Sequence, residues 1–114
     1  MSRLMSVSLT EHAVVARRKT VTRRRGWLFL RPGDRLTLCR KVMGRRPGEE
    51  LVRLAEVEVI SVRREPLNAI TREDVRAEGF EGYAGPAWFV RFWLAHMGGE
   101  PDQAVTRIEW RYLP

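Results

Sequence analysis

The sequence predicts an α+β fold built around a small, strongly bent sheet, and three observations carry this prediction. The run 105–113 alternates an apolar set of side chains with a charged set, as a half-buried strand does. The run 51–63 is rich in β-branched residues and partly apolar on both faces, which favours a long, bent strand in a small closed sheet. Three further segments carry helix start and stop signals. The 114 residues fit a single domain, 1–114, with one hydrophobic core.

The first helix is expected near the start of the chain. Residues 8–11 read Ser-Leu-Thr-Glu, the spacing of a capping box, so a helix should begin near Ser8 or Thr10 and end close to Arg18. Cationic side chains in its last turn suit the negative end of the helix dipole. The residues expected on its buried face are Leu9, Ala13 and Ala16.

An extended segment should follow over residues 19–24. Three consecutive β-branched residues, 20–22, disfavour a helix and favour a strand. Alternation along a strand would place Thr20, Thr22 and Arg24 on one side and Lys19, Val21 and Arg23 on the other. Gly26 permits a bend after it, and the sequence Pro-Gly-Asp at 32–34 predicts a turn.

The middle of the chain predicts a β-hairpin. Residues 35–41 alternate as a strand, with Leu36 and Leu38 on one face. Residues 43–50 contain two glycines and a proline and form a polar hairpin loop before the long strand 51–63. The single cysteine, Cys39, lies in the first of these strands and fits a reducing compartment.

Two more helices are expected in the second half. Residues 71–74 have capping-box spacing, so a short helix should run to about Glu78 and stop at Gly79. A loop with room for motion is expected over 81–85. Pro86 then opens a helix to about Met97. Its apolar stripe is Phe89, Phe92, Trp93 and His96, of which the first three are expected to be core.

The charge points to an acidic partner. The formal charge is +7 and the pI about 10.9, mostly from arginine, which suits bidentate contacts to phosphate and base edges. Nucleic acid and an anionic membrane surface are the two candidates. No apolar run approaches the roughly 20 residues of a spanning helix, and the first residues lack the apolar core of a signal peptide, so a soluble cytoplasmic protein is expected.

The most cationic stretch is 17–25, where six of nine residues are arginine or lysine, and Trp27 follows it. Cations neutralise phosphates, threonine hydroxyls bond phosphate or base, and an indole offers a stacking face. A nucleic-acid-binding site is therefore one interpretation of this stretch, and a solvent-exposed basic helix end is the other. Trp27 likewise fits either a base-stacking position or the core.

Several sequence motifs together resemble the ASCH domain family. Residues 19–24 read Lys-Thr-Val-Thr-Arg-Arg, and they are followed by Trp27, by Pro-Gly-Asp at 32–34 and by Glu-Gly-Phe at 78–80. The resemblance extends from about Ser6 to Leu113. The segments 24–33, 62–67 and 105–109 look like ASCH proteins of actinobacteria and their phages.

The resemblance implies a PUA-like fold, a small, bent, mixed β-barrel with about three flanking helices. It also implies RNA binding, and in some members hydrolysis of 4-acetylcytidine or nuclease activity. The positions that match the amidohydrolase members' catalytic residues are Lys19, Thr22 and Glu78. The same residues can instead hold a nucleotide without turnover, or Glu78 can form an ion pair with Lys19 or Arg24 that closes the barrel mouth.

The leading hypothesis is binding of RNA or single-stranded DNA in a basic cleft, because extra cations and an aromatic suit a polymer better than a free nucleoside. The alternatives are a hydrolase of a modified nucleoside, a nuclease using Lys19, Thr22 and Glu78, and an interface for an acidic protein. The residues expected to bind nucleic acid are Arg18, Lys19, Thr20, Thr22, Arg23, Arg24, Arg25 and Trp27, with Arg45 and Arg46 extending a phosphate track.

Metal and cofactor sites are not expected. His12, His96 and Cys39 lie far apart without the paired spacings of a zinc site. The sequence contains no glycine-rich phosphate loop and no dinucleotide fingerprint. Base preference and oligomeric state do not follow from the sequence.

Overall fold

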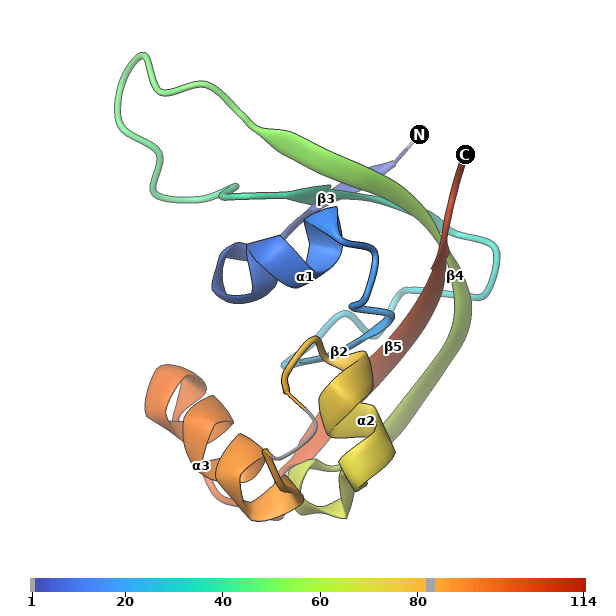
Figure 1. Ribbon diagram of the computed structural model, residues 1–114, viewed down its shortest axis with the longest axis vertical. Helices are drawn as coiled ribbons and strands as arrows, with labels where there is room; N and C mark the ends of the chain where they lie inside the picture. Colours follow the sequence, from blue (N-terminus) through green and yellow to red (C-terminus); the bar gives the residue numbers. More distant parts are fainter. Residues whose placement is uncertain (1, 82–83) are drawn as a thin grey trace.

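The computed structural model describes residues 2–81 and 84–114, which form one curled sheet with helices packed inside its curve (Figure 1). The strands are β1 (Arg3–Ser6), β2 (Val21–Arg24), β3 (Arg35–Cys39), β4 (Arg53–Pro66) and β5 (Ala104–Tyr112). The helices are α1 (Glu11–Val15), α2 (Arg72–Ala77) and α3 (Pro86–Met97), with 3-10 turns η1 (Ser8–Thr10) and η2 (Leu67–Ala69).

The sheet has the strand order β1-β3-β4-β5-β2. The pair β1 and β3 is parallel and the other pairs are antiparallel, so the sheet is mixed. The 14-residue strand β4 pairs with both β3 and β5, and its register with β5 shifts between Val59 and Ser61. Such a shift bends a strand and increases its twist. Over the residues that the structure describes, the predicted α+β fold with a bent, mixed barrel is confirmed as a five-stranded half-barrel with three α-helices.

Two clusters of buried apolar side chains lie along this sheet. The first fills the curve and contains Met5, Val7, Val14, Leu30, Leu36, Leu38, Val57, Val59, Ile108 and Trp110. The second joins α2 and α3 to the sheet and contains Leu67, Ile70, Val75, Phe89, Trp93 and Val105. The candidate site described below takes side chains from both clusters.

The helices α2 and α3 confirm the sequence predictions. The Asp74 backbone N–H donates to Thr71 Oγ1 at 3.2 Å, which is the expected N-terminal cap of α2. The helix α2 ends at Ala77, and Glu78 is its C-cap, followed by Gly79 at φ +106°. The helix α3 covers the expected range. The expected loop 81–85 includes residues 82 and 83, which lie outside the described residues.

The prediction for α1 is wrong in length and in face. This helix has five residues and follows the turn η1, and its N-cap Thr10 makes no capping hydrogen bond within the described part of the chain. Leu9 and Ala16 are exposed, whereas Thr10, Ala13 and Val14 are buried. The helix stops early because Arg17 adopts φ +59°; its N–H donates to the Val14 carbonyl, and the N–H groups of Arg18 and Lys19 donate to the Ala13 carbonyl.

The strands confirm the predicted positions with shifted ends. The strand β3 stops two residues early at Cys39, which is buried, and β4 begins at Arg53 and continues to Pro66. Leu36 to Cys39 are all buried, so the expected alternation of β3 does not separate a solvent-exposed face from a buried face. No helix within the described ranges is long and apolar enough to cross a bilayer.

Candidate nucleic-acid site

A pocket of about 180 Å³ opens between η1 and α3. The chain segment leading into β2, the strand itself and the residues that follow α2 supply its polar side chains. The polar and charged lining residues are Ser6, Ser8, Thr10, Lys19, Thr22, Arg23, Arg24, Glu78 and His96. The apolar ones are Val7, Leu9, Phe80, Phe89, Phe92, Trp93 and Met97.

Lys19 is fixed directly before β2 and is 2% exposed. Its Nζ donates to Oε1 and to the backbone oxygen of Glu78, each at 2.8 Å. The Lys19 carbonyl accepts from Trp110 Nε1 at 3.0 Å and from the Tyr112 hydroxyl at 2.5 Å, so the backbone is held as well. Burial lowers the pKa of the Lys19 ammonium, and the nearby Glu78 carboxylate opposes this effect.

Glu78 lies between two cations, Lys19 and Arg23. One oxygen accepts from Lys19, and the other accepts from Arg23 Nη1 at 3.3 Å. Glu78 is 4% exposed and caps the C-terminus of α2. The Thr20 N–H donates to the Ala77 carbonyl at 2.8 Å, which ties the end of α2 to the start of β2. The ion pair between Glu78 and Lys19, one of the alternatives that the sequence left open, therefore exists in the structure.

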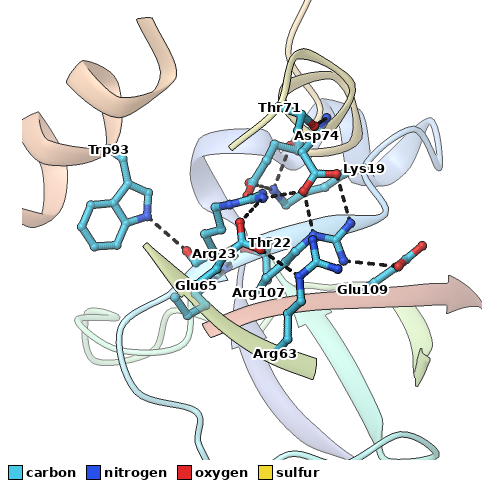
Figure 2. Close-up of polar contacts among 12 residues, drawn as sticks. Lys19, Thr22, Arg23, Arg63, Glu65, Thr71, Asp74, Trp93, Arg107 and Glu109 are labelled. Carbon is cyan, nitrogen blue, oxygen red and sulfur yellow. Dashed lines mark hydrogen bonds and ion pairs between the residues drawn. The ribbon is translucent and has the colours of Figure 1, made fainter. Parts of the chain in front are cut away.

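Arg23 is the centre of a buried charge network (Figure 2). Its Nη2 donates to Glu65 at 2.9 Å and to Asp74, and Asp74 also accepts from Arg107 Nε at 2.7 Å. Hydrogen bonds from Arg107 and from Arg23 lower the pKa of Asp74 to about 2, against the effect of burial. Among the described residues, Arg23 Nε is the only buried side-chain nitrogen or oxygen without a hydrogen bond. The Arg23 guanidinium is thus occupied by protein carboxylates.

Thr22 and Arg24 face the same side of β2, as alternation predicts. Arg24 Nε donates to Thr22 Oγ1 at 3.0 Å, and Arg24 Nη2 donates to the Ser6 carbonyl at 2.6 Å. Thr22 is 3% exposed. Alternation also placed Lys19 on the opposite side, but Lys19 precedes β2 and reaches the pocket from outside the strand. The pocket therefore brings Lys19, Thr22 and Glu78 together.

One wall of the pocket is aromatic. Phe89, Phe92 and Trp93 line it from α3, and Phe80 lines it from the segment after α2. Phe89 and Trp93 are also buried in the second core cluster, as predicted, whereas Phe92 is only half-buried and lies outside that cluster, so the core prediction is wrong for Phe92. Trp93 Nε1 donates to the Arg23 carbonyl at 3.2 Å, which couples α3 to β2. Phe80 was not predicted as a site residue, although its position two residues after Glu78 could have indicated that it lies near the pocket.

Other expected binding residues lie outside this pocket. Trp27 packs against the first core cluster with its ring centroid 5.5 Å from that of Phe29, which fits the core interpretation. The Arg25 guanidinium lies 5.6 Å from the centroid of the Trp93 ring and donates to the Gly98 carbonyl at 3.0 Å. Arg18, Arg45 and Arg46 are exposed, and Thr20 is half-buried.

The described part of the chain contains no cluster of three or more histidine, cysteine, aspartate or glutamate side chains placed to hold a metal ion. The carboxylates of Glu65, Asp74 and Glu78 face arginine and lysine instead.

The curled mixed sheet with helices packed inside its curve is the fold of ASCH domain proteins. An ASCH domain from Lactobacillus crispatus superposes with a TM-score of 0.66 at 12% identity, over 96% of this chain and 79% of that one. An ASCH protein from Zymomonas mobilis superposes with a TM-score of 0.64 at 15% identity, over 95% of this chain and 65% of that one. A protein from Enterococcus faecalis described under family model DUF984 superposes with a TM-score of 0.68 at 17% identity, over 99% of this chain and 76% of that one. No family model and no curated protein matches the sequence.

Proposed function

We propose that this chain is a single ASCH domain that binds RNA or single-stranded DNA and takes one unpaired base into the pocket. The observation that carries the proposal is the pocket itself, which joins an aromatic wall to buried hydrogen-bonding groups in a chain of net charge +7. An unpaired base has an apolar face for stacking and a polar edge for hydrogen bonds. A volume of about 180 Å³ favours a ligand the size of one base over a larger one.

The polar groups of the pocket have capacity left for a base edge. A carboxylate accepts about four hydrogen bonds, and the bonds from Lys19 and Arg23 leave room on Glu78 for a base amino group. The Thr22 hydroxyl accepts from Arg24 and keeps its own proton to donate. Lys19 and Arg23 are paired with carboxylates, so exposed arginines such as Arg18 and Arg25 supply the phosphate contacts.

The proposal is tested by fluorescence titration with short single-stranded RNA and DNA at two salt concentrations, followed by chromatography of the oligonucleotide. Salt-sensitive binding with intact oligonucleotide is expected. Glu78→Gln should weaken binding because it removes the acceptor charge, whereas Glu81→Gln, an exposed neighbour in sequence, should not. Absence of binding to both polymers at low salt would refute the proposal.

Hydrolysis of a modified nucleoside is a second candidate function. The observation that favours it is the burial of Lys19, Thr22 and Glu78 at one pocket, with a lowered pKa for the lysine. A lysine with a lowered pKa next to a carboxylate can act as a general base, and a threonine hydroxyl becomes nucleophilic when a base removes its proton.

The two functions differ in the effect of Thr22→Ala. For the hydrolase, this change should abolish turnover of 4-acetylcytidine and leave its affinity largely intact, while Thr22→Ser should retain part of the activity. Release of cytidine is followed by chromatography. No release by the wild-type protein would remove the hydrolase and leave the binding function.

A further inference from the structure

A strip of aromatic side chains continues from the pocket along α3. Trp88, Phe92 and His96 are spaced four residues apart and therefore lie on one helix face. The Trp88 and Phe92 rings are stacked, with centroids 5.2 Å apart and an interplanar angle of 13°. The Phe92 and His96 centroids are 4.6 Å apart. Phe92 and His96 line the pocket, whereas Trp88 lies beyond its lining.

The outer end of this strip is accessible. Trp88 is 38% exposed, so part of its large apolar side chain contacts solvent although a core cluster lies next to it. Phe80 meets both Trp88 and Phe92 edge-on, with centroids 5.2 Å and 5.1 Å away, and so fixes their orientation. Because Phe92 covers one face of the Trp88 ring, this stacked pair offers the other face of Trp88 as a rigid, flat surface.

The charge around the strip suits a polyanion. The helix α3 contains no acidic residue between Pro86 and Met97, and it carries an exposed arginine, Arg91, next to Phe92. Arg25 is anchored at the other end of the helix through the Gly98 carbonyl. Flat aromatic rings flanked by cations are the features with which proteins hold single strands.

We propose that Trp88, Phe92 and His96 form a stacking platform for the bases that flank the base in the pocket. This inference rests on the proposed function, since it assigns the path of the same single strand. The strand passes from the pocket along α3, and an adjacent base stacks on the exposed Trp88. Phosphates along this path lie near Arg91 and Arg25. The platform is sequence-tolerant, because every base has a flat face.

The test combines a protein change with a matching ligand change. An eight-nucleotide RNA is compared with the same RNA in which every nucleotide except one central base is abasic, so that length and phosphate charge stay constant. The protein variants are Trp88→Leu, which keeps an apolar side chain, and Trp88→Phe, which keeps an aromatic face. Phe29→Leu is the control, because Phe29 is 51% exposed but lies outside the pocket lining.

We expect Trp88→Leu to weaken binding of the full RNA at least about fivefold and to change binding of the abasic RNA little. Trp88→Phe should recover most of the loss, and Phe29→Leu should bind as the wild type does. Equal effects of Trp88→Leu on the two RNAs, or no effect on either, would overturn the platform while the pocket function stands. Failure of the wild type to bind either RNA would overturn both.

Discussion

Arg23 illustrates what the buried charges contribute at the level of single residues. Its guanidinium contacts the carboxylates of Glu65, Asp74 and Glu78, which come from β4, α2 and the end of α2. Taking these groups out of water is costly unless each is hydrogen-bonded, and a planar fork with five donors can serve three carboxylates where a lysine cannot. Arg23 therefore orients Glu78 and is better understood as a support for the pocket than as a phosphate contact.

Asp74 provides a pH-dependent test of this network. Its pKa falls from 3.8 to about 2 in the folded state, so it stabilises the fold fully above about pH 4 and loses that contribution as the pH falls toward 2. The contribution is on the order of 1–2 kcal/mol. Urea unfolding of the wild type should show this loss between pH 4 and pH 2, and a carboxyl titration of Asp74 by NMR should have its midpoint near 2.

The matched variants for this test are Asp74→Asn and Asp102→Asn. Asp74→Asn should be less stable at pH 6 and should lose less stability than the wild type between pH 4 and pH 2. Asp102 is exposed at the turn before β5, so its variant should keep the wild-type pH dependence. A wild-type titration midpoint near 3.8 would contradict the assigned role of the two arginines.

At the level of elements, Gly79 joins the end of α2 to α1. It adopts φ +106°, and a Cβ at this position would lie 2.7 Å from the Ala13 Cβ. Gly79→Ala should therefore combine backbone strain with overpacking and destabilise the protein by about 2–4 kcal/mol. Gly33 has a similar φ of +97° but nothing within 4 Å, so Gly33→Ala should cost only about 1 kcal/mol.

Urea unfolding of the two alanine variants measures the difference. Because the two φ angles are alike, the excess destabilisation for Gly79→Ala reports the close approach of α1 to the end of α2. Equal destabilisation by the two changes would show that α1 can move away from Gly79. A loss of ligand affinity specific to Gly79→Ala is also expected, since Glu78 and Lys19 flank this contact.

The elements differ in how well the sequence predicted them. The helices α2 and α3 were predictable because their start signals are local, the Thr71 cap for α2 and Pro86 for α3. The end of α1 was not, because it depends on the Arg17 backbone and on packing against Gly79 from a distant segment. The resemblance gave Lys19, Thr22 and Glu78, because they belong to local sequence motifs. The aromatic wall of the pocket and the binding of Arg23 to Glu65 and Asp74 could not be predicted, because they join segments that are distant in the sequence.

At the scale of the whole molecule, the charges separate into two groups. Lys19, Arg23 and Arg107 are buried and paired with carboxylates. Most other arginines are exposed and are spread over the surface, including those of the β3–β4 loop, which Figure 1 shows at the opposite end of the molecule from α3. The buried set shapes the pocket, and the exposed set gives the long-range attraction that makes binding sensitive to salt.

This separation predicts that the salt dependence of binding changes with the length of the oligonucleotide. The longest dimension of the molecule is 37 Å, which corresponds to about eleven nucleotides at the spacing of about 3.4 Å per phosphate of a stacked strand. A twelve-nucleotide strand held in the pocket is therefore long enough to reach Arg45 and Arg46 on the β3–β4 loop. The double variant Arg45→Gln with Arg46→Gln should therefore leave binding of a trinucleotide unchanged. For a twelve-nucleotide RNA it should reduce the slope of log affinity against log salt by about 1.4, or 0.7 for each lost phosphate contact.

The control for this prediction is the double variant Arg31→Gln with Arg35→Gln, which removes two exposed arginines on either side of the 32–34 turn. It lowers the net charge by the same amount, so any effect of net charge alone appears equally in both double variants. Titrations of the wild type and of the two double variants with the trinucleotide and the twelve-nucleotide RNA at several salt concentrations give six slopes. A phosphate track to the β3–β4 loop requires that only the Arg45 and Arg46 pair change the slope, and only for the longer RNA. Equal slopes for the two double variants would mean that the loop charges act through the overall field and that the strand takes another path.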